Sequence, residues 1–145
     1  MANGVATAAA SPYDVTASVA GYCNTSTPKY EASKVARYVS VARTEAALEA
    51  AVATQPVSVA IQGLQGPFMF YDSGVLTQEC GIQLDHGVLV VGYGHDDEQG
   101  VDYWLVKNDF GSDWGEDGYA RLQKGVAQYG GQCGIVLDAT YPVLA

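Results

Sequence analysis

The stretch LDHGVLVVGYG, Leu84–Gly94, decides the fold. After His86 it continues as an unbroken apolar run, GVLVVGY, from Gly87 to Tyr93. A short continuous apolar run is typical of a central strand that is buried on both faces. The run therefore predicts a strand at the centre of a sheet, with His86 immediately before it.

Segments on either side of this run predict its neighbours in the sheet. Pro56–Ile61 (PVSVAI) alternates and is rich in β-branched residues, and Asp102–Lys107 and Gly118–Gln123 alternate as well. Such runs, bounded by turn residues, are typical of strands. Glycines concentrate from Gly63 onward, so the later part of the chain is expected to consist of short strands joined by tight turns.

Helical segments are expected beside the sheet. Thr44–Ala53 is the stronger one, because Thr44 can cap it, Glu45 lies near the positive end of its dipole and Pro56 prevents its continuation. Pro67–Tyr71 (PFMFY) predicts a helical turn packed on the core. The buried stripe of the first helix is predicted from helical spacing to be Ala47, Leu48, Ala51 and Val52. Together these elements predict an α+β unit, an antiparallel β-sheet packed by one or two short helices.

The composition limits the classes of binding partner that can be expected. The 145 residues suit one ordinary domain, and seven Lys and Arg against sixteen Asp and Glu give a net charge of -9. This charge argues against nucleic acid or an anionic membrane surface as a partner, and no apolar run approaches the roughly 18 residues of a membrane span. Residues 1–12 are rich in alanine and are expected to form an irregular tail, and residues 13–145 are expected to form the domain. The tail lacks the basic region and continuous apolar core of a signal peptide, so no targeting signal is expected in this chain.

His86 and Asn108 are the first candidates for chemistry. His86 precedes the central strand and Asn108 ends the next one, so the two side chains could lie side by side. An asparagine oxygen could then accept the imidazole N–H and leave the other ring nitrogen free, which is what a thiol nucleophile needs. By spacing alone, a structural histidine beside a strand is the commoner case. The cysteine and histidine spacings predict no metal site, and no cofactor is expected.

A series of motifs extends this interpretation. QPVSVAI, FYDSGV, ECGIQLDHGVLVVGYG, YWLVKNDFGSDWGEDGY, CGI and YPV occur in this order. In order and separation they resemble the papain-like cysteine peptidases, from about Tyr13 to Val143. The resemblance implies the family's right-hand, β-barrel-like domain, in which His86 and Asn108 are the catalytic pair. The family's helical first domain, with its Q-G-x-C-G-x-C-W type motif, has no match here. The nucleophilic cysteine and the glutamine of the oxyanion hole are therefore missing from this chain.

The resemblance also assigns the three cysteines. It implies a disulfide between Cys80 and Cys133, which points to an oxidising compartment. Cys23 matches a cysteine whose partner lies in the first half, so it is expected to be an unpaired thiol. A secretory, vacuolar-lysosomal or extracellular location follows from the same resemblance.

Further site residues follow from the same alignment of motifs. The family usually has KNSWG and then WG where this chain has KNDFG and DWG. Phe110 and Trp114 are therefore expected to shield the catalytic pair, and Asp109 replaces a serine and adds a negative charge near His86. The main specificity pocket matches Ala60, Leu84 and Asp138. Asp138 could admit Arg or Lys, or it could be only a solvated carboxylate. Asp85 is expected to position substrate backbone or solvent.

These inferences leave three functional hypotheses. The chain is part of a cysteine endopeptidase acting on peptides or proteins, it is an inactive homologue that serves as a binding module, or it is a truncated product. The isolated chain is predicted to be inactive as a thiol peptidase. An exposed interdomain face predicts a partner chain or a homodimer.

Overall fold

The computed structural model describes residues 4–12, 26–30, 33–64 and 66–145. The chain forms two compact units, of which Met1–Val39 with Pro142–Ala145 is one and Ser40–Tyr141 is the other. The second unit contains every candidate site residue except Cys23, which lies outside the described residues. The predicted boundary between residues 12 and 13 also borders a segment that is not described.

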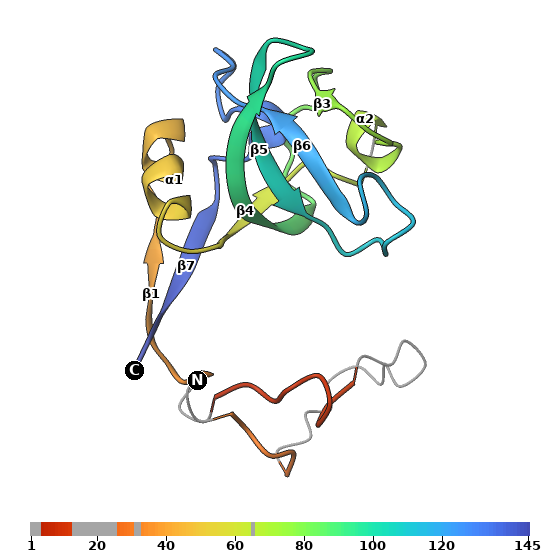
Figure 1. Ribbon diagram of the computed structural model, residues 1–145. Coiled ribbons are helices and arrows are strands. Elements are labelled where there is room, and N and C mark those ends of the chain that lie inside the picture. The colour runs from red at the N-terminus through yellow and green to blue at the C-terminus, as the bar shows by residue number, and fades with distance from the viewer. Residues whose placement is uncertain (1–3, 13–25, 31–32, 65) are drawn as a thin grey trace. The chain divides into compact units, whose positions relative to one another are not determined.

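Most of the described secondary structure belongs to one sheet of seven strands (Figure 1). Its order is β1-β7-β2-β4-β5-β6-β3. The strands are β1 (Val35–Ser40), β2 (Val57–Ile61), β3 (Val75–Leu76), β4 (His86–Asp96), β5 (Val101–Lys107), β6 (Tyr119–Gln123) and β7 (Ala139–Leu144). The pairs of β2 with β4 and β7, of β4 with β5 and of β5 with β6 are antiparallel, whereas β3 pairs with β6 in parallel.

Two short α-helices flank the strands. α1 (Glu45–Val52) begins where predicted, because the Thr44 side chain accepts a hydrogen bond from the Ala47 amide at 3.2 Å. It packs against β2 and β4, with Leu48 and Val52 buried. α2 (Gly66–Met69) is the predicted aromatic turn and lies near β3 in Figure 1. A 3₁₀ turn, η2 (Gln132–Gly134), precedes β7. The predicted sheet with one or two short helices is confirmed, and the strand pairs given above are antiparallel except that of β3 with β6.

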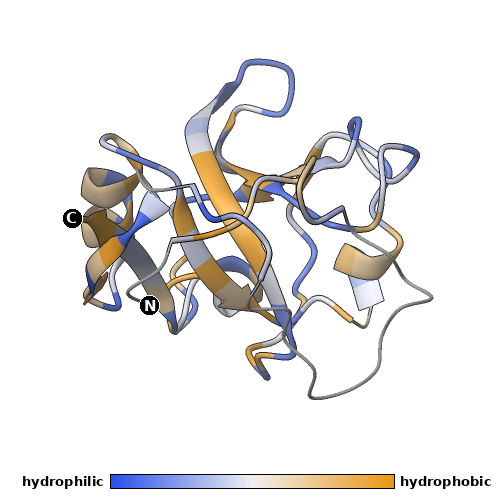
Figure 2. Ribbon diagram, turned by 90° about the horizontal axis from the view of Figure 1, so that it is seen from below, coloured by the Kyte–Doolittle hydropathy of each residue, from blue (hydrophilic) through white to orange (hydrophobic). Residues whose placement is uncertain are grey.

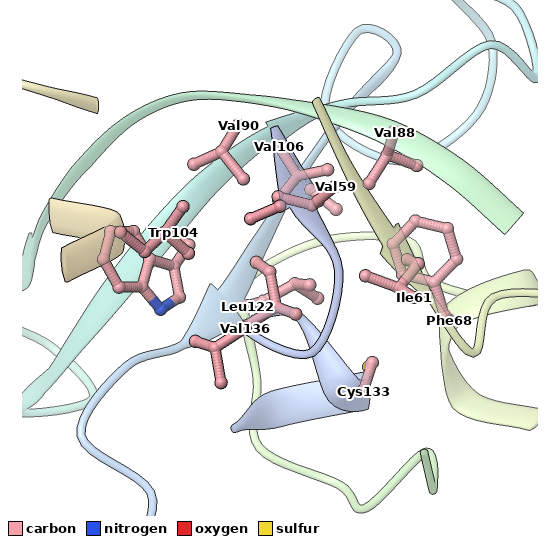
Figure 3. Packing of buried hydrophobic residues seen from close by; sticks show 14 of the residues in the cluster. Val59, Ile61, Phe68, Val88, Val90, Trp104, Val106, Leu122, Cys133 and Val136 are labelled. Carbon is pink, nitrogen blue, oxygen red and sulfur yellow. The ribbon is translucent and has the colours of Figure 1, made fainter. Parts of the chain in front are cut away.

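The core lies on one face of β2, β4, β5 and β6 (Figure 3). In Figure 3 Trp104 occupies one end of the cluster, and Phe68 from α2 occupies the other end beside Ile61. Both aromatic side chains are fully buried. Figure 2 shows apolar colouring along the strands and polar colouring in most of the connecting loops.

The central strand corrects one expectation. β4 was predicted to be buried on both faces, yet only Val88 and Val90 of its apolar run are buried, while Leu89 and Val91 are half-buried. The reason is that the core fills only one face of the sheet. The strand also extends beyond the predicted run to Asp96, with a β-bulge between Val90 and Gly92.

No helix within the described ranges is long and apolar enough to cross a membrane.

Candidate functional site

The structure brings His86 and Asn108 together. His86 is the first residue of β4, Asn108 follows the last residue of β5, and these strands pair from Leu89 opposite Lys107 onward. The Nε2 atom of His86 lies 2.7 Å from Oδ1 of Asn108. The Asn108 amide donates to the carbonyl of Gly118 at 3.0 Å, which fixes its backbone. Since an amide oxygen only accepts, this contact places the ring proton on Nε2.

The other ring nitrogen of His86 is available for chemistry. Nδ1 has no hydrogen-bond partner among the described residues, and the His86 side chain is 9% exposed. With Nε2 protonated, Nδ1 carries the lone pair that can take a proton from a nucleophile. The arrangement can therefore orient an imidazole and transfer a proton.

Aromatic rings cover the pair. Phe110 stacks on the imidazole, with ring centroids 4.9 Å apart and an interplanar angle of 27°. Trp114 meets Phe110 edge-on at 5.5 Å, and Phe68 lies 5.0 Å from Trp114. The Trp114 Nε1–H donates to the carbonyl of Met69 at 3.0 Å. Of the two rings named from the sequence, Phe110 lies against one face of the imidazole, and Trp114 packs against Phe110.

The loop after β2 packs against the other side of the histidine. A Cβ built on Gly63 would lie 2.9 Å from Cδ2 of His86, so the backbone there is in close contact with the ring. The Asp85 carboxylate holds this loop, because its Oδ1 accepts from the amides of Gly63 at 2.7 Å and Leu64 at 3.1 Å. This oxygen of Asp85 is therefore engaged within the chain.

Two of the three predicted pocket residues lie together. Ala60 and Asp138 line one hollow of about 150 Å³ beside Gly87, and the Ala60 amide donates to the Asp138 carbonyl at 2.9 Å. The Asp138 residue itself is exposed. Leu84 does not line this hollow and instead lies against Gly134, where an added Cβ would meet its Cδ2 at 2.8 Å.

A disulfide links Cys80 and Cys133, as predicted. Both cysteines are buried, and the Gln132 side chain donates to the carbonyl of Gln78 at 2.5 Å beside them. The Gln62 amide donates to the Cys133 carbonyl at 2.8 Å. The disulfide therefore ties the segment that leads into β4 to the segment that leads into β7.

A group of charged residues anchors the end of the loop after β5. Arg121 donates to both carboxylate oxygens of Glu116, at 2.8 and 2.6 Å, and also contacts Asp96. Glu116 also accepts from the Gly74 amide at 2.9 Å. The hydrogen bonds from Arg121 hold the pKa of the Glu116 carboxyl below its ordinary value.

The sequence reasoning missed one aromatic residue beside the pair. Phe68 was not named as a site residue, yet its ring centroid lies 6.0 Å from that of His86. The aromatic cluster PFMFY was the available signal, but its contact with His86 depends on the path of the loop between β2 and α2.

The described residues offer no site for a metal ion. None of them form a group of three or more His, Cys, Asp and Glu side chains that could hold one.

His95 contacts Asp102 at 2.7 Å on the exposed β4–β5 hairpin, and this hydrogen bond raises the pKa of His95.

Comparisons with known proteins agree with one another. A family profile described as "Papain family cysteine protease" matches residues 1–143. The chain is 46% identical over 124 residues to cysteine proteinase COT44 of Brassica napus, covering 85% of this chain and 37% of the relative. It is 54% identical over 102 residues to cysteine endopeptidase Rep1 of Oryza sativa subsp. japonica, covering 70% and 27%. The chain thus spans well under half the length of these curated relatives.

A solved structure extends the likeness to the fold. The bromelain protease from Ananas comosus, in complex with the E64 inhibitor, has a TM-score of 0.87 and 38% identity. The match covers 99% of this chain and 64% of that chain. The expected papain-like fold is confirmed by this match, which covers only part of that chain.

Proposed function

Since the chain belongs to the papain family of cysteine proteases, we propose that it supplies the histidine and asparagine of a cysteine endopeptidase's active site. The observation that carries the proposal is the 2.7 Å contact between His86 Nε2 and Asn108 Oδ1 under the ring of Phe110. In this role His86 takes the proton of a thiol through Nδ1 and stabilises the thiolate as an ion pair. It later returns the proton to the leaving amine.

The nucleophile must come from outside the described residues. Cys80 and Cys133 are joined in a disulfide and have no thiol to ionise. No Q-G-x-C-G-x-C-W type run occurs in the 145 residues, so the glutamine of the oxyanion hole is absent as well. The proposed enzyme is therefore complete only with a cysteine-bearing half, supplied upstream in a longer chain or as a separate chain.

The partner half is proposed to dock on the face of the sheet opposite the core. A hollow of about 490 Å³ opens there beside Asn108 and Asp109, and its other lining residues are Ser58, Gly87, Val88, Leu89 and Lys107. Leu89 and Leu105 are half-buried on this face, so a cysteine-bearing half that covers them gains apolar contact. A second copy of this chain would bury the same residues without supplying the Q-G-x-C-G-x-C-W type motif that carries the nucleophile.

The substrate is proposed to be a peptide or protein whose side chain enters the hollow lined by Ala60 and Asp138. The exposed Asp138 carboxylate gives that hollow a charge partner for Arg or Lys. A buried disulfide favours synthesis in an oxidising compartment, which supports a secretory, vacuolar-lysosomal or extracellular location for the completed enzyme.

Complementation tests the proposal. The pure chain, the cysteine-bearing first half of a relative such as the Brassica napus proteinase, and a co-refolded mixture of the two are incubated with a fluorogenic Phe-Arg dipeptide. We expect turnover only in the mixture, abolished by an alkylating epoxide and reduced at least about 100-fold by His86→Ala, the loss of a general base. His95→Ala is the matched control and should keep full activity.

Two results contradict the proposal. Alkylator-sensitive turnover by the pure chain would place a nucleophile within it. A mixture that forms a stable complex but hydrolyses nothing would favour the alternative function, an inactive homologue that acts as a binding module.

A further inference from the structure

Two acceptors face the same ring nitrogen of His86. Asn108 Oδ1 lies 2.7 Å from Nε2, and Asp109 Oδ1 lies 3.6 Å from it. We propose that Asp109 is a second positioning residue, which accepts the Nε2 proton when Asn108 turns away. Its consequence for catalysis rests on the proposed function, but the contact itself can be tested on this chain alone.

Asp109 is free to make this contact. Its side chain is 77% exposed, and within the described parts of the chain no other hydrogen bond or ion pair holds its carboxylate. A rotation between side-chain rotamers moves a carboxylate oxygen by more than the shortfall between 3.6 Å and a hydrogen bond. The carboxylate of Asp85, the residue before His86, is instead engaged with the amides of Gly63 and Leu64.

Only one of the two polar atoms of the Asn108 side-chain amide has a hydrogen-bond partner among the described residues. Its Oδ1 faces His86, but its Nδ2 is buried and has no hydrogen-bond partner in the described chain. A buried amide group without a partner disfavours the orientation that leaves it so. If the amide rotates, a donor replaces the acceptor in front of Nε2–H, and only Asp109 can then accept this proton.

The two acceptors differ in charge. An amide oxygen is neutral, whereas the Asp109 carboxylate forms a charge-assisted hydrogen bond with a protonated ring, and such bonds are about twice as strong. The family motif that this sequence resembles, KNSWG, has serine at this place. The proposed second acceptor, Asp109, therefore comes from this chain's KNDFG sequence.

Exchange of the His86 Nε2 proton with water, measured by NMR on the full chain, tests the inference. We expect Asn108→Ala to accelerate exchange by less than about threefold, because Asp109 accepts the proton in its place. Asp109→Ala alone, which removes the second acceptor, should change it by less than about twofold. In the variant that combines these two substitutions the proton should exchange at least about tenfold faster than in the native chain, because its hydrogen bond is lost. Asn108→Ala with Asp113→Ala is the matched control, since Asp113 is an exposed acid of the same loop.

Equal exchange in Asn108→Ala and in the double variant would overturn the inference. If Asn108→Ala does not fold, the native chain supplies a second measurement. The ¹³Cγ resonance of Asp109 should shift as His86 becomes protonated while that of Asp113 stays constant, and an unresponsive Asp109 would also overturn it. Neither readout needs activity, so failure of the complementation assay leaves this test intact.

Discussion

Trp114 donates its indole Nε1–H to the carbonyl oxygen of Met69 at 3.0 Å. This bond joins the loop after β5 to α2, two segments that are 45 residues apart in sequence. Phe110 lies on the same loop, and its ring stacks on His86. A bond made outside the catalytic pair therefore tethers the loop that carries this ring.

Trp114→Phe tests this dependence. The variant keeps an aromatic ring but loses the indole N–H, so we expect the free energy of unfolding to fall by about 1 kcal/mol. Urea denaturation followed by circular dichroism measures the change. Tyr129→Phe, at a side chain that is 70% exposed, is the control and should leave stability unchanged. A Trp114→Phe chain as stable as the native one would show that the bond contributes nothing.

Asp85→Ala should loosen the loop that packs against His86. The variant removes the acceptor of two backbone amides, those of Gly63 and Leu64, and bonds to a charged acceptor contribute about 1.5–3 kcal/mol each. Because the site is partly exposed, we expect a loss of about 1–2 kcal/mol in total. Hydrogen exchange of the Gly63 amide should accelerate at least about fivefold, while that of a β5 amide such as Val106 should follow global stability only. Unchanged exchange at Gly63 would remove Asp85 from this role.

Removing the disulfide should cost about 2–4 kcal/mol, because the bond closes a long loop between residues separated by 53 positions. The double variant Cys80→Ala and Cys133→Ala, compared with the native chain in denaturant without reductant, measures the loss. Mass spectrometry of the alkylated native chain provides the control. Alkylation of both cysteines without reduction would show that the bond is absent in solution.

Glu116 should make stability sensitive to acid. Hydrogen bonds from Arg121 lower the pKa of its carboxyl below the ordinary value of 4.5. A carboxyl with a lowered folded-state pKa stabilises the fold above its unfolded value and loses that contribution as pH falls through the folded value. Stability should therefore decline as pH falls below about 4.5, and Glu116→Gln should reduce that slope. Denaturation midpoints between pH 3 and 7 test this, with Asp117→Asn as the control. An unchanged slope would contradict the assignment.

Much of the fold could be predicted from local patterns. The cap at Thr44, the aromatic turn at α2 and the strands β2, β5 and β6 follow from residue preferences that act within a few positions. β1, β3 and β7 could not be predicted in this way. β3 has only two residues, and its edge is paired by the Gln99 side chain, which bonds both the amide and the carbonyl of Val75. Such an element exists only because distant parts of the chain meet.

The sequence by itself determined the family motifs and the candidates His86 and Asn108, because these are properties of residue type and order, and the resemblance carried by those motifs implied the pairing of Cys80 with Cys133. The tertiary structure alone decided which of them touch. It separated Leu84 from Ala60 and Asp138, turned Asp85 toward the loop after β2, and set two acceptors before one nitrogen of His86. The physical reason is that hydrogen bonds and ring contacts act over a few ångströms, and only the packing of distant segments brings side chains within that range.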